Sequence, residues 1–101
     1  MENVNRNTQS SPSIGPKVLL ENARVRVIER HIKAGVKTRM HSHPDVIMYG
    51  LKDSRTKYCY PDGSESVIDL RAGDVIFKQA ESHIAELLWP EESLDLMIEL
   101  K

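Results

Sequence analysis

Several features that mark particular protein classes are scarce in this chain of 101 residues. It contains one cysteine, which excludes an intramolecular disulfide and a cysteine-rich zinc site. No apolar run approaches the roughly 20 residues that cross a bilayer, so we expect no membrane segment. The 14 basic and 15 acidic residues give a net charge of −1, without the basic excess typical of nucleic-acid binding.

The first 16 residues are rich in Asn, Ser and Pro and contain little that is apolar. We expect them to form a flexible N-terminal arm, with the alternative that they lie across a partner subunit. They contain neither the basic stretch nor the apolar stretch of a secretory signal, which together with the single cysteine favours a cytoplasmic location. Residues 17–101 have the size and composition of one small domain.

Short stretches rich in Val, Ile and Tyr, separated by turn residues, make up this domain. Val25 and Val27 alternate with arginines, which is the period of two expected of a half-buried strand. No stretch of 12 residues has helical periodicity, and a short helix after Pro90 is less favoured than a strand. We therefore expect an all-β sandwich or small barrel with little or no helix. The eight expected strands are residues 23–32, 36–43, 46–51, 56–60, 66–70, 75–78, 83–89 and 94–100.

Histidine is the residue type whose placement carries the most chemistry. His41 and His43 lie two residues apart on an expected strand, so their side chains project from the same face, with Cα atoms about 6.5–7 Å apart. His83 opens another expected strand directly after a turn. Three neutral imidazoles hold a divalent ion and leave positions open for water or substrate. The sequence therefore predicts a metal site of His41, His43 and His83, and a structural or surface role for His31.

The residues around these histidines resemble the two motifs of the cupin family. Gly35, five further residues and His41-Ser42-His43 resemble the first motif, G-x5-H-x-H. The segment Gly73–His83 resembles the second, G-x5-P-x-G-x2-H, with Gln79 for Pro, Glu81 for Gly and one residue fewer. The resemblance covers essentially the whole expected domain. It implies a cupin-type jelly-roll β-barrel, usually a homodimer, with a metal held by histidines of both motifs.

The chain departs from the family pattern at one metal ligand. The first cupin motif usually supplies a glutamate four or five residues after its second histidine, where this chain has Ile47 and Met48. It thus resembles cupins with a three-histidine site, such as diketone-cleaving and thiol dioxygenases, and small bacterial cupins of poorly defined role. Without the carboxylate a divalent ion keeps its charge of +2, which favours an anionic, bidentate ligand. Asp45, Glu81 and Glu86 are candidate replacements, and Glu86 is favoured as a hydrogen-bond partner of an imidazole.

We therefore expect a metal-binding cupin that acts as an enzyme, with oxygenase-like or Lewis-acid chemistry on a small anionic metabolite. The alternatives are a non-catalytic small-molecule-binding or sensory cupin and a metal-free structural dimer. Iron is favoured as the metal, with zinc, nickel, manganese and copper as alternatives. No catalytic acid or base is assigned. Met48, Arg39 and Tyr49 are further candidates for the pocket, although a solvated rim position is favoured for Arg39 and a core or dimer-interface position for Tyr49.

Overall fold

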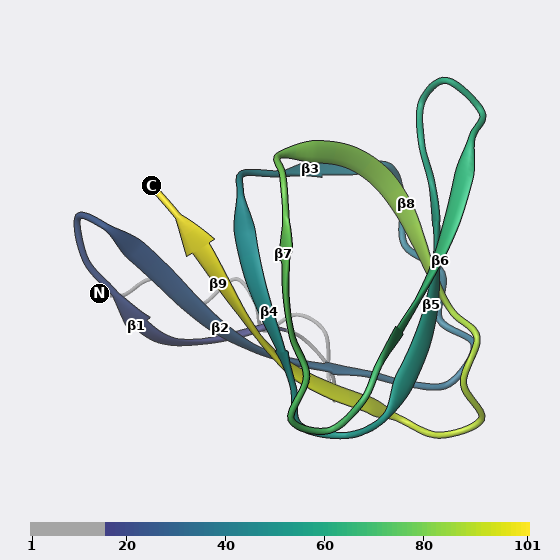
Figure 1. Cartoon of the computed structure of the whole chain (residues 1–101), viewed down its shortest axis with the longest axis horizontal. Coiled ribbons are helices and arrows are strands. Elements are labelled where there is room, and N and C mark those ends of the chain that lie inside the picture. The colour runs from purple at the N-terminus through teal and green to yellow at the C-terminus, as the bar shows by residue number, and fades with distance from the viewer. Residues whose placement is uncertain (1–15) are drawn as a thin grey trace.

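The computed structural model describes residues 16–101, so the arm expected at the N-terminus lies almost entirely outside the described residues. The described part contains nine strands and no helix, and therefore no helix that is long and apolar enough to cross a membrane. The strands form two antiparallel sheets in a jelly-roll-like arrangement (Figure 1). Their bounds are β1 (Lys17–Glu21), β2 (Val25–Ile32), β3 (His41–His43), β4 (Val46–Gly50), β5 (Ser54–Cys59), β6 (Glu65–Leu70), β7 (Val75–Lys78), β8 (Glu81–Leu87) and β9 (Ser93–Leu100).

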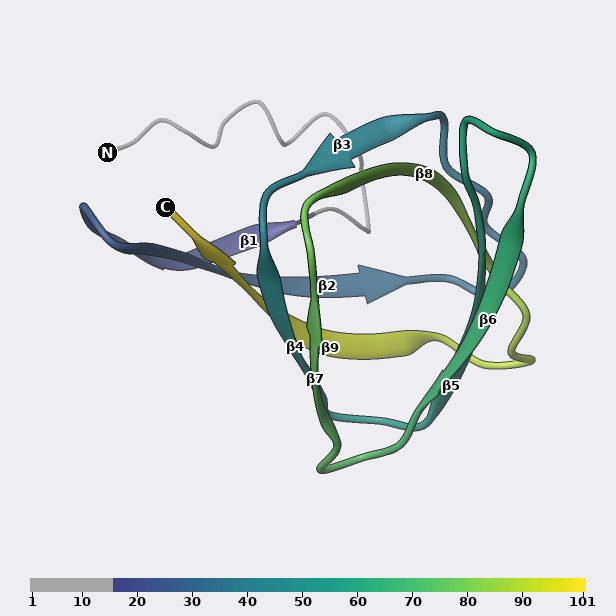
Figure 2. The same cartoon turned by 45° about the horizontal axis from the view of Figure 1, so that its top comes forward.

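Neither sheet follows the order of the strands in the sequence. One sheet has the order β1-β2-β9-β4-β7 and the other has the order β3-β8-β5-β6. In Figure 2, β3 and β8 arch over β2 and β9, which belong to the opposite wall. Among the described residues β3 pairs only with β8, so the sheets do not close into the barrel that the resemblance implied.

The apolar core lies on the inner face of the five-stranded sheet. Val46 and Met48 on β4 alternate with less buried residues, as the period of two requires. They pack with Ile28 of β2, Met97 of β9 and Leu70 of β6, and each of the five is at most 5% exposed. Burying one such side chain contributes about 1.5–3 kcal/mol, so this cluster fixes the wall that faces the histidines.

The structure differs from the expected strands at two points. Beyond the eight segments named from the sequence, β1 forms a ninth strand, which pairs with β2 at the edge of the larger sheet. The strand expected over residues 36–43 is shorter, and only β3 (His41–His43) is regular. The Thr38 hydroxyl accepts a hydrogen bond from the Ala85 amide at 2.9 Å, so a side chain replaces a backbone group in the ladder there. The strand expected at 94–100, rather than a helix, is confirmed by β9.

Gly50 joins the end of β4 to the turn before β7. Its amide donates to the Asp74 carbonyl at 2.9 Å, and its carbonyl accepts from the Gly73 amide at 2.8 Å. A Cβ atom at this position would lie 2.5 Å from the Arg71 carbonyl oxygen. Only glycine allows the two backbone segments to approach this closely, and the contact fixes where β7 begins.

Candidate metal centre

The pairing of β3 with β8 brings the three predicted histidines together. His41 lies directly opposite His83, and His43 lies opposite Glu81. Because side chains alternate between faces, these four side chains share the inner face of the sheet. The intervening Ser42 and Ser82 are also opposite each other, and their hydroxyl oxygens lie 2.6 Å apart. The pairing of β3 with β8 thus places the His41–His83 pair next to the His43–Glu81 pair on one face.

The three imidazoles form a compact cluster. One ligand atom from each of His41, His43 and His83 lies within 4.8 Å of the others. The ring centroid of His41 is 4.6 Å from that of His43 and 4.8 Å from that of His83, with interplanar angles of 88° and 87°. Nitrogens bound to one zinc ion at about 2.0–2.1 Å are more closely spaced than 4.8 Å, so an ion would draw the rings inward by small rotations.

Hydrogen bonds select which ring nitrogen is available to a metal. Nδ1 of His41 lies 2.7 Å from the Arg39 carbonyl oxygen, which can only accept, so Nδ1 carries the proton. Nδ1 of His83 donates to Oε2 of Glu81, also at 2.7 Å. In the neutral form of each ring, Nε2 is then the nitrogen with a free lone pair. Metal-binding histidines commonly have their other nitrogen bound in this way, so the donor set fits a divalent ion.

The environment keeps two of these imidazoles neutral. Burial first, and then the neighbouring rings of His41 and His83, lower the pKa of His43 from 6.5 to about 4. Burial also lowers the pKa of His83, although the hydrogen bond with Glu81 acts in the opposite direction. Burial alone would raise the pKa of Glu81, but contacts with Lys78 and His83 outweigh it and lower that pKa. An ionised carboxylate thus faces a neutral imidazole, which is the form that binds metals.

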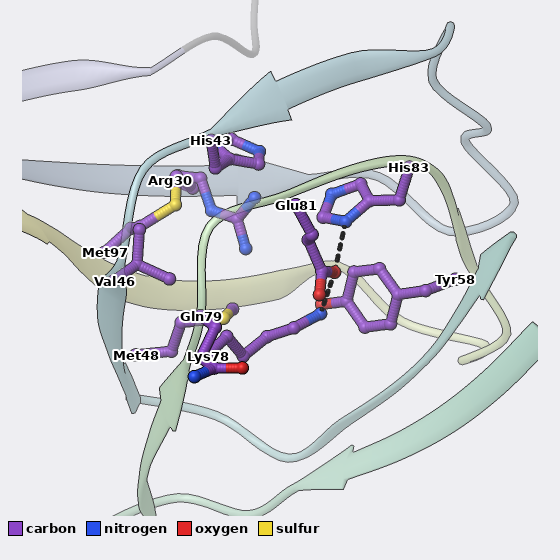
Figure 3. Close-up of a pocket in the computed structure, with 10 residues that line it drawn as sticks. All are labelled: Arg30, His43, Val46, Met48, Tyr58, Lys78, Gln79, Glu81, His83 and Met97. Carbon is purple, nitrogen blue, oxygen red and sulfur yellow. Dashed lines mark hydrogen bonds and ion pairs between the residues drawn. The ribbon is translucent and has the colours of Figure 1, made fainter. Parts of the chain in front are cut away.

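A narrow pocket lies beneath the cluster (Figure 3). The space between its walls is about 10 Å³, which is room for roughly one water molecule. Its walls combine apolar side chains of the core with several charged groups. The lining residues are Arg30, His43, Val46, Met48, Tyr58, Lys78, Gln79, Glu81, His83 and Met97.

A wider cavity of about 340 Å³ lies on the side toward β2 and shares Arg30, His43 and Met97 with the narrow pocket. This volume lies within the range of small-molecule sites. Ile28 and Ile32 contribute apolar surface to it. The wider cavity therefore provides an approach to His43 and, through it, to the cluster.

The charged groups of the interior occur as ion pairs. The pairs are Arg30–Asp95, with nitrogen–oxygen distances of 3.0 and 2.9 Å, Lys78–Glu81 at 2.8 Å and Arg26–Glu99 at 3.9 Å. Burial acts to lower the pKa of Arg30, but the Asp95 carboxylate outweighs it and the pKa is raised. Arg30 and Lys78 are each paired with one carboxylate, whereas Arg26, whose side chain is 41% exposed, lies 3.9 Å from both Glu99 and Glu21.

The other residues named from the sequence lie in several places. Met48 is buried in the wall of the narrow pocket. Glu86 lies away from the cluster, where its carboxylate is 3.6 Å from the Lys57 ammonium. Arg39 contributes its carbonyl group, and its side chain does not line either cavity described above. Tyr49 lies on the other face of β4 from Met48, and its neighbours on the adjacent strands are Leu96 of β9 and Val75 of β7.

Asp45 and His31 both lie outside the histidine cluster. Asp45 accepts a hydrogen bond from the Ala80 amide at 2.8 Å, which ties the segment after β3 to the segment before β8. His31 lies near the surface, with Nδ1 2.7 Å from Glu92 Oε2 and Nε2 3.7 Å from Glu29 Oε1. Neither residue belongs to the cluster of metal-binding atoms.

Sequence reasoning overlooked Lys78 and Arg30, and it considered Glu81 only as a replacement metal ligand. Lys78 and Arg30 line the narrow pocket, and Glu81 holds His83, a role that the sequence had favoured for Glu86. The sequence does contain a signal for Glu81, because it precedes His83 by two residues and so shares its face on a strand. No comparable local signal marks Arg30, which lies 53 positions before His83 in the sequence.

Solved structures with the same arrangement of strands identify the fold. A cupin domain from Bordetella pertussis Tohama I aligns over 89% of this chain and 95% of its own, with a TM-score of 0.78 and 24% identity. The chain has a cupin fold. A Klebsiella pneumoniae protein with a double-stranded β-helix domain aligns over 89% of this chain and 78% of its own, with a TM-score of 0.67 and 22% identity.

A chain from the structures of two DMSP lyases shares the cupin fold as well. It aligns over 87% of this chain and 47% of its own, with a TM-score of 0.65 and 17% identity. No protein-family model and no curated protein sequence matches the chain. The fold expected from the two motifs is thus confirmed by structure, and the histidines of those motifs form a cluster that can bind a metal.

Proposed function

We propose that this cupin binds one divalent metal ion through His41, His43 and His83 and uses it to act on a small anionic metabolite. The observation that carries the proposal is the pair of hydrogen bonds on Nδ1 of His41 and of His83, which leaves both Nε2 atoms free within the cluster. Histidines that lie close together by chance are not expected to have Nδ1 hydrogen-bonded in two of the three rings. Iron is the resident metal that we propose.

The charge balance favours an anionic ligand. Because the cluster contains three neutral imidazoles and no carboxylate, a divalent ion held there would keep a charge of +2 within its own set of protein ligands. The wider cavity gives such a ligand an approach beside His43. Bound there, a divalent ion would polarise an oxygen or sulfur atom of the ligand.

The chain's own residues have distinct tasks in this proposal. Glu81 holds the His83 ring in one orientation and keeps its proton on Nδ1. The Arg39 carbonyl does the same for His41. Met48 supplies an apolar wall, which limits water around the histidines and strengthens electrostatic interactions there.

The alternative is a binding or sensory cupin that has the same metal site but catalyses no reaction. The matched chain from the DMSP lyase structures has this fold in about half of its length, so the fold also occurs within an enzyme. We propose an enzyme, because open coordination positions beside a cavity large enough for a metabolite suit a reaction at the metal.

The test is metal analysis of protein purified without added metal, followed by turnover assays. We expect one equivalent of a divalent metal, with iron in excess over zinc, nickel, manganese and copper. Oxygen uptake would be followed with diketones, thiols and keto acids, and non-oxidative product formation by mass spectrometry. The proposal would be contradicted if the purified protein contained less than one equivalent of metal and still did so after incubation with Fe²⁺ under anaerobic conditions. Bound metal without turnover would favour the binding cupin.

A further inference from the structure

Lys78 is a charged side chain on the inner face of the larger sheet, at the end of the edge strand β7. It follows Val75, Ile76 and Phe77 on β7 and pairs across the sheet with the buried Val46 of β4. Its side chain is 10% exposed. Moving an ammonium group out of water costs several kcal/mol, so such a lysine is expected to have compensating partners.

The partners present account for only part of the hydrogen-bonding capacity of this ammonium. Nζ lies 2.8 Å from Glu81 Oε2 and 3.4 Å from the centroid of the Tyr58 ring. An ammonium group carries three N–H donors. Among residues 16–101, Glu81 is the only carboxylate within ion-pair distance of Nζ, and the buried Nζ makes no well-aligned hydrogen bond. At least one N–H of this buried ammonium is therefore left without an acceptor among the described residues, on a side chain that lines the narrow pocket.

Arg30 reaches the same narrow pocket from β2. Its Nε and Nη2 atoms donate to the two oxygens of Asp95 at 3.0 and 2.9 Å. This pair orients the guanidinium, and the Tyr58 hydroxyl is a further partner beside it, so Asp95 and Tyr58 together use part of its N–H groups. In Figure 3 the guanidinium of Arg30 lies beside His43, and the ammonium of Lys78 ends at the Glu81 carboxylate next to the Tyr58 ring.

We propose that Lys78, supported by Arg30, binds the carboxylate of a ligand held at the histidine cluster. The inference rests on the proposed metal site and names the class of ligand: a small chelating carboxylate such as a 2-oxo acid. The narrow pocket holds about one water molecule, which matches one carboxylate oxygen that takes its place. The rest of the ligand lies in the wider cavity, against Ile28 and Ile32.

Two chelating probes separate recognition of a carboxylate from binding to the metal. Pyruvate chelates a metal through its oxo group and one carboxylate oxygen, and its second carboxylate oxygen is free to meet Lys78. Acetylacetone chelates as its enolate through both oxygens and has no third. Binding of each probe to the Co²⁺-loaded protein is followed by visible absorption at pH 7.

The variant is K78M, which keeps the length of the side chain and suits the neighbouring Met48 and Tyr58. K78Q is the second variant if K78M does not fold. K57M is the matched control, since Lys57 also pairs with a glutamate across two strands, Glu86 at 3.6 Å, but lies outside the pocket. We expect K78M to bind pyruvate at least tenfold more weakly and acetylacetone within twofold of wild type, with unchanged Co²⁺ stoichiometry. K57M should match wild type with both probes.

Three results would overturn the inference while leaving the metal site intact. These are pyruvate affinity unchanged in K78M and K78Q, equal losses for both probes, and a wild-type Co²⁺ protein that binds neither probe. Loss of Co²⁺ from K78M would also overturn it, because Lys78 would then act on His83 through Glu81 rather than on a ligand. A wild-type protein that binds no Co²⁺ would instead remove the proposed function, and this inference with it.

Discussion

Replacement of Glu81 by glutamine tests how the site holds its metal-binding rings. The Glu81 carboxylate accepts a hydrogen bond from His83 Nδ1 at 2.7 Å and lies 2.8 Å from the Lys78 ammonium. E81Q keeps the size of the side chain and an oxygen acceptor but removes the charge. Hydrogen bonds to a charged acceptor are roughly twice as strong as those to a neutral one, so His83 Nε2 becomes a weaker and less firmly oriented ligand.

The expected effect can be bounded. Loss of such a partner of a metal-binding histidine lowers metal affinity by about 10- to 100-fold. Because the amide oxygen of E81Q still accepts a hydrogen bond, we expect the lower end, about tenfold or 1.4 kcal/mol. E86Q is the matched control, since Glu86 pairs with Lys57 and contacts none of the three histidines. Its metal affinity should stay within twofold of wild type.

Competition with a chromophoric chelator for Zn²⁺ at pH 7 measures these affinities directly. Thermal unfolding of the metal-free variants checks that each is folded before affinities are compared. Equal affinities for wild type and E81Q would refute the argument that Glu81 orients His83. A loss in E86Q as large as that in E81Q would show that the partner was assigned to the wrong carboxylate.

Three further predictions concern stability and assembly. In metal-free protein, the pKa of His43 is about 4 when folded against 6.5 for a free histidine, so the unfolded chain takes up the proton first as pH falls. The free energy of unfolding, measured with urea, should be at its full value above pH 6.5 and decrease by up to about 3 kcal/mol toward pH 4. H43N should make this pH profile flatter. A rise in stability toward pH 4 would contradict the direction of the pKa shift. G50A places a methyl group 2.5 Å from the Arg71 carbonyl oxygen and should destabilise by about 2 kcal/mol in the same assay, whereas an unchanged midpoint would mean that the turn before β7 moves freely. Phe77, 56% exposed on the edge strand β7, is a candidate contact of the expected homodimer, so light scattering should find dimers for wild type and monomers for F77D; a monomeric wild type would contradict the expectation.

The features that could be predicted from the sequence are those that depend on local spacing. The interval of two between His41 and His43 sets a common face wherever those residues form a strand, and β3 provides it. The turn at residues 61–64 also depends on local chemistry: Asp62 accepts hydrogen bonds from the backbone and hydroxyl of Ser64, and Gly63 has a φ of 91°. Neither inference requires knowledge of which segments pair across the fold.

The partner of His83 was harder to predict because it depends on where a strand begins. The sequence suggests that this strand starts at His83, which leaves Glu81 in a turn, whereas β8 starts at Glu81 itself. Two additional residues of strand place Glu81 on the same face as His83 and opposite His43. Strand boundaries are set by pairing partners as much as by local propensity, so an error of two residues there changed the assignment.

The charged lining of the pocket could not be predicted, because on β2 the charged residues of the alternating pattern face inward. Val25 and Val27 alternate with Arg26, which by itself suggests valines inside and arginines outside. In the structure Arg26 and Arg30 share the inner face with Ile28, where Asp95 and Glu99 of β9 pair with them. Only the pairing of β2 with β9 reveals that these arginines have buried partners.

The most direct test of the account is the position of a metal in a crystal of Ni²⁺-loaded protein, located by anomalous diffraction. The account predicts one strong anomalous peak per chain, bonded to one nitrogen each of His41, His43 and His83, with Nε2 the ligand atom of His41 and His83. H83A crystals treated in the same way should lack the peak. Strong peaks only elsewhere, such as at His31 with Glu92, or no peak in wild-type protein, would contradict the claim that these three histidines form a metal centre.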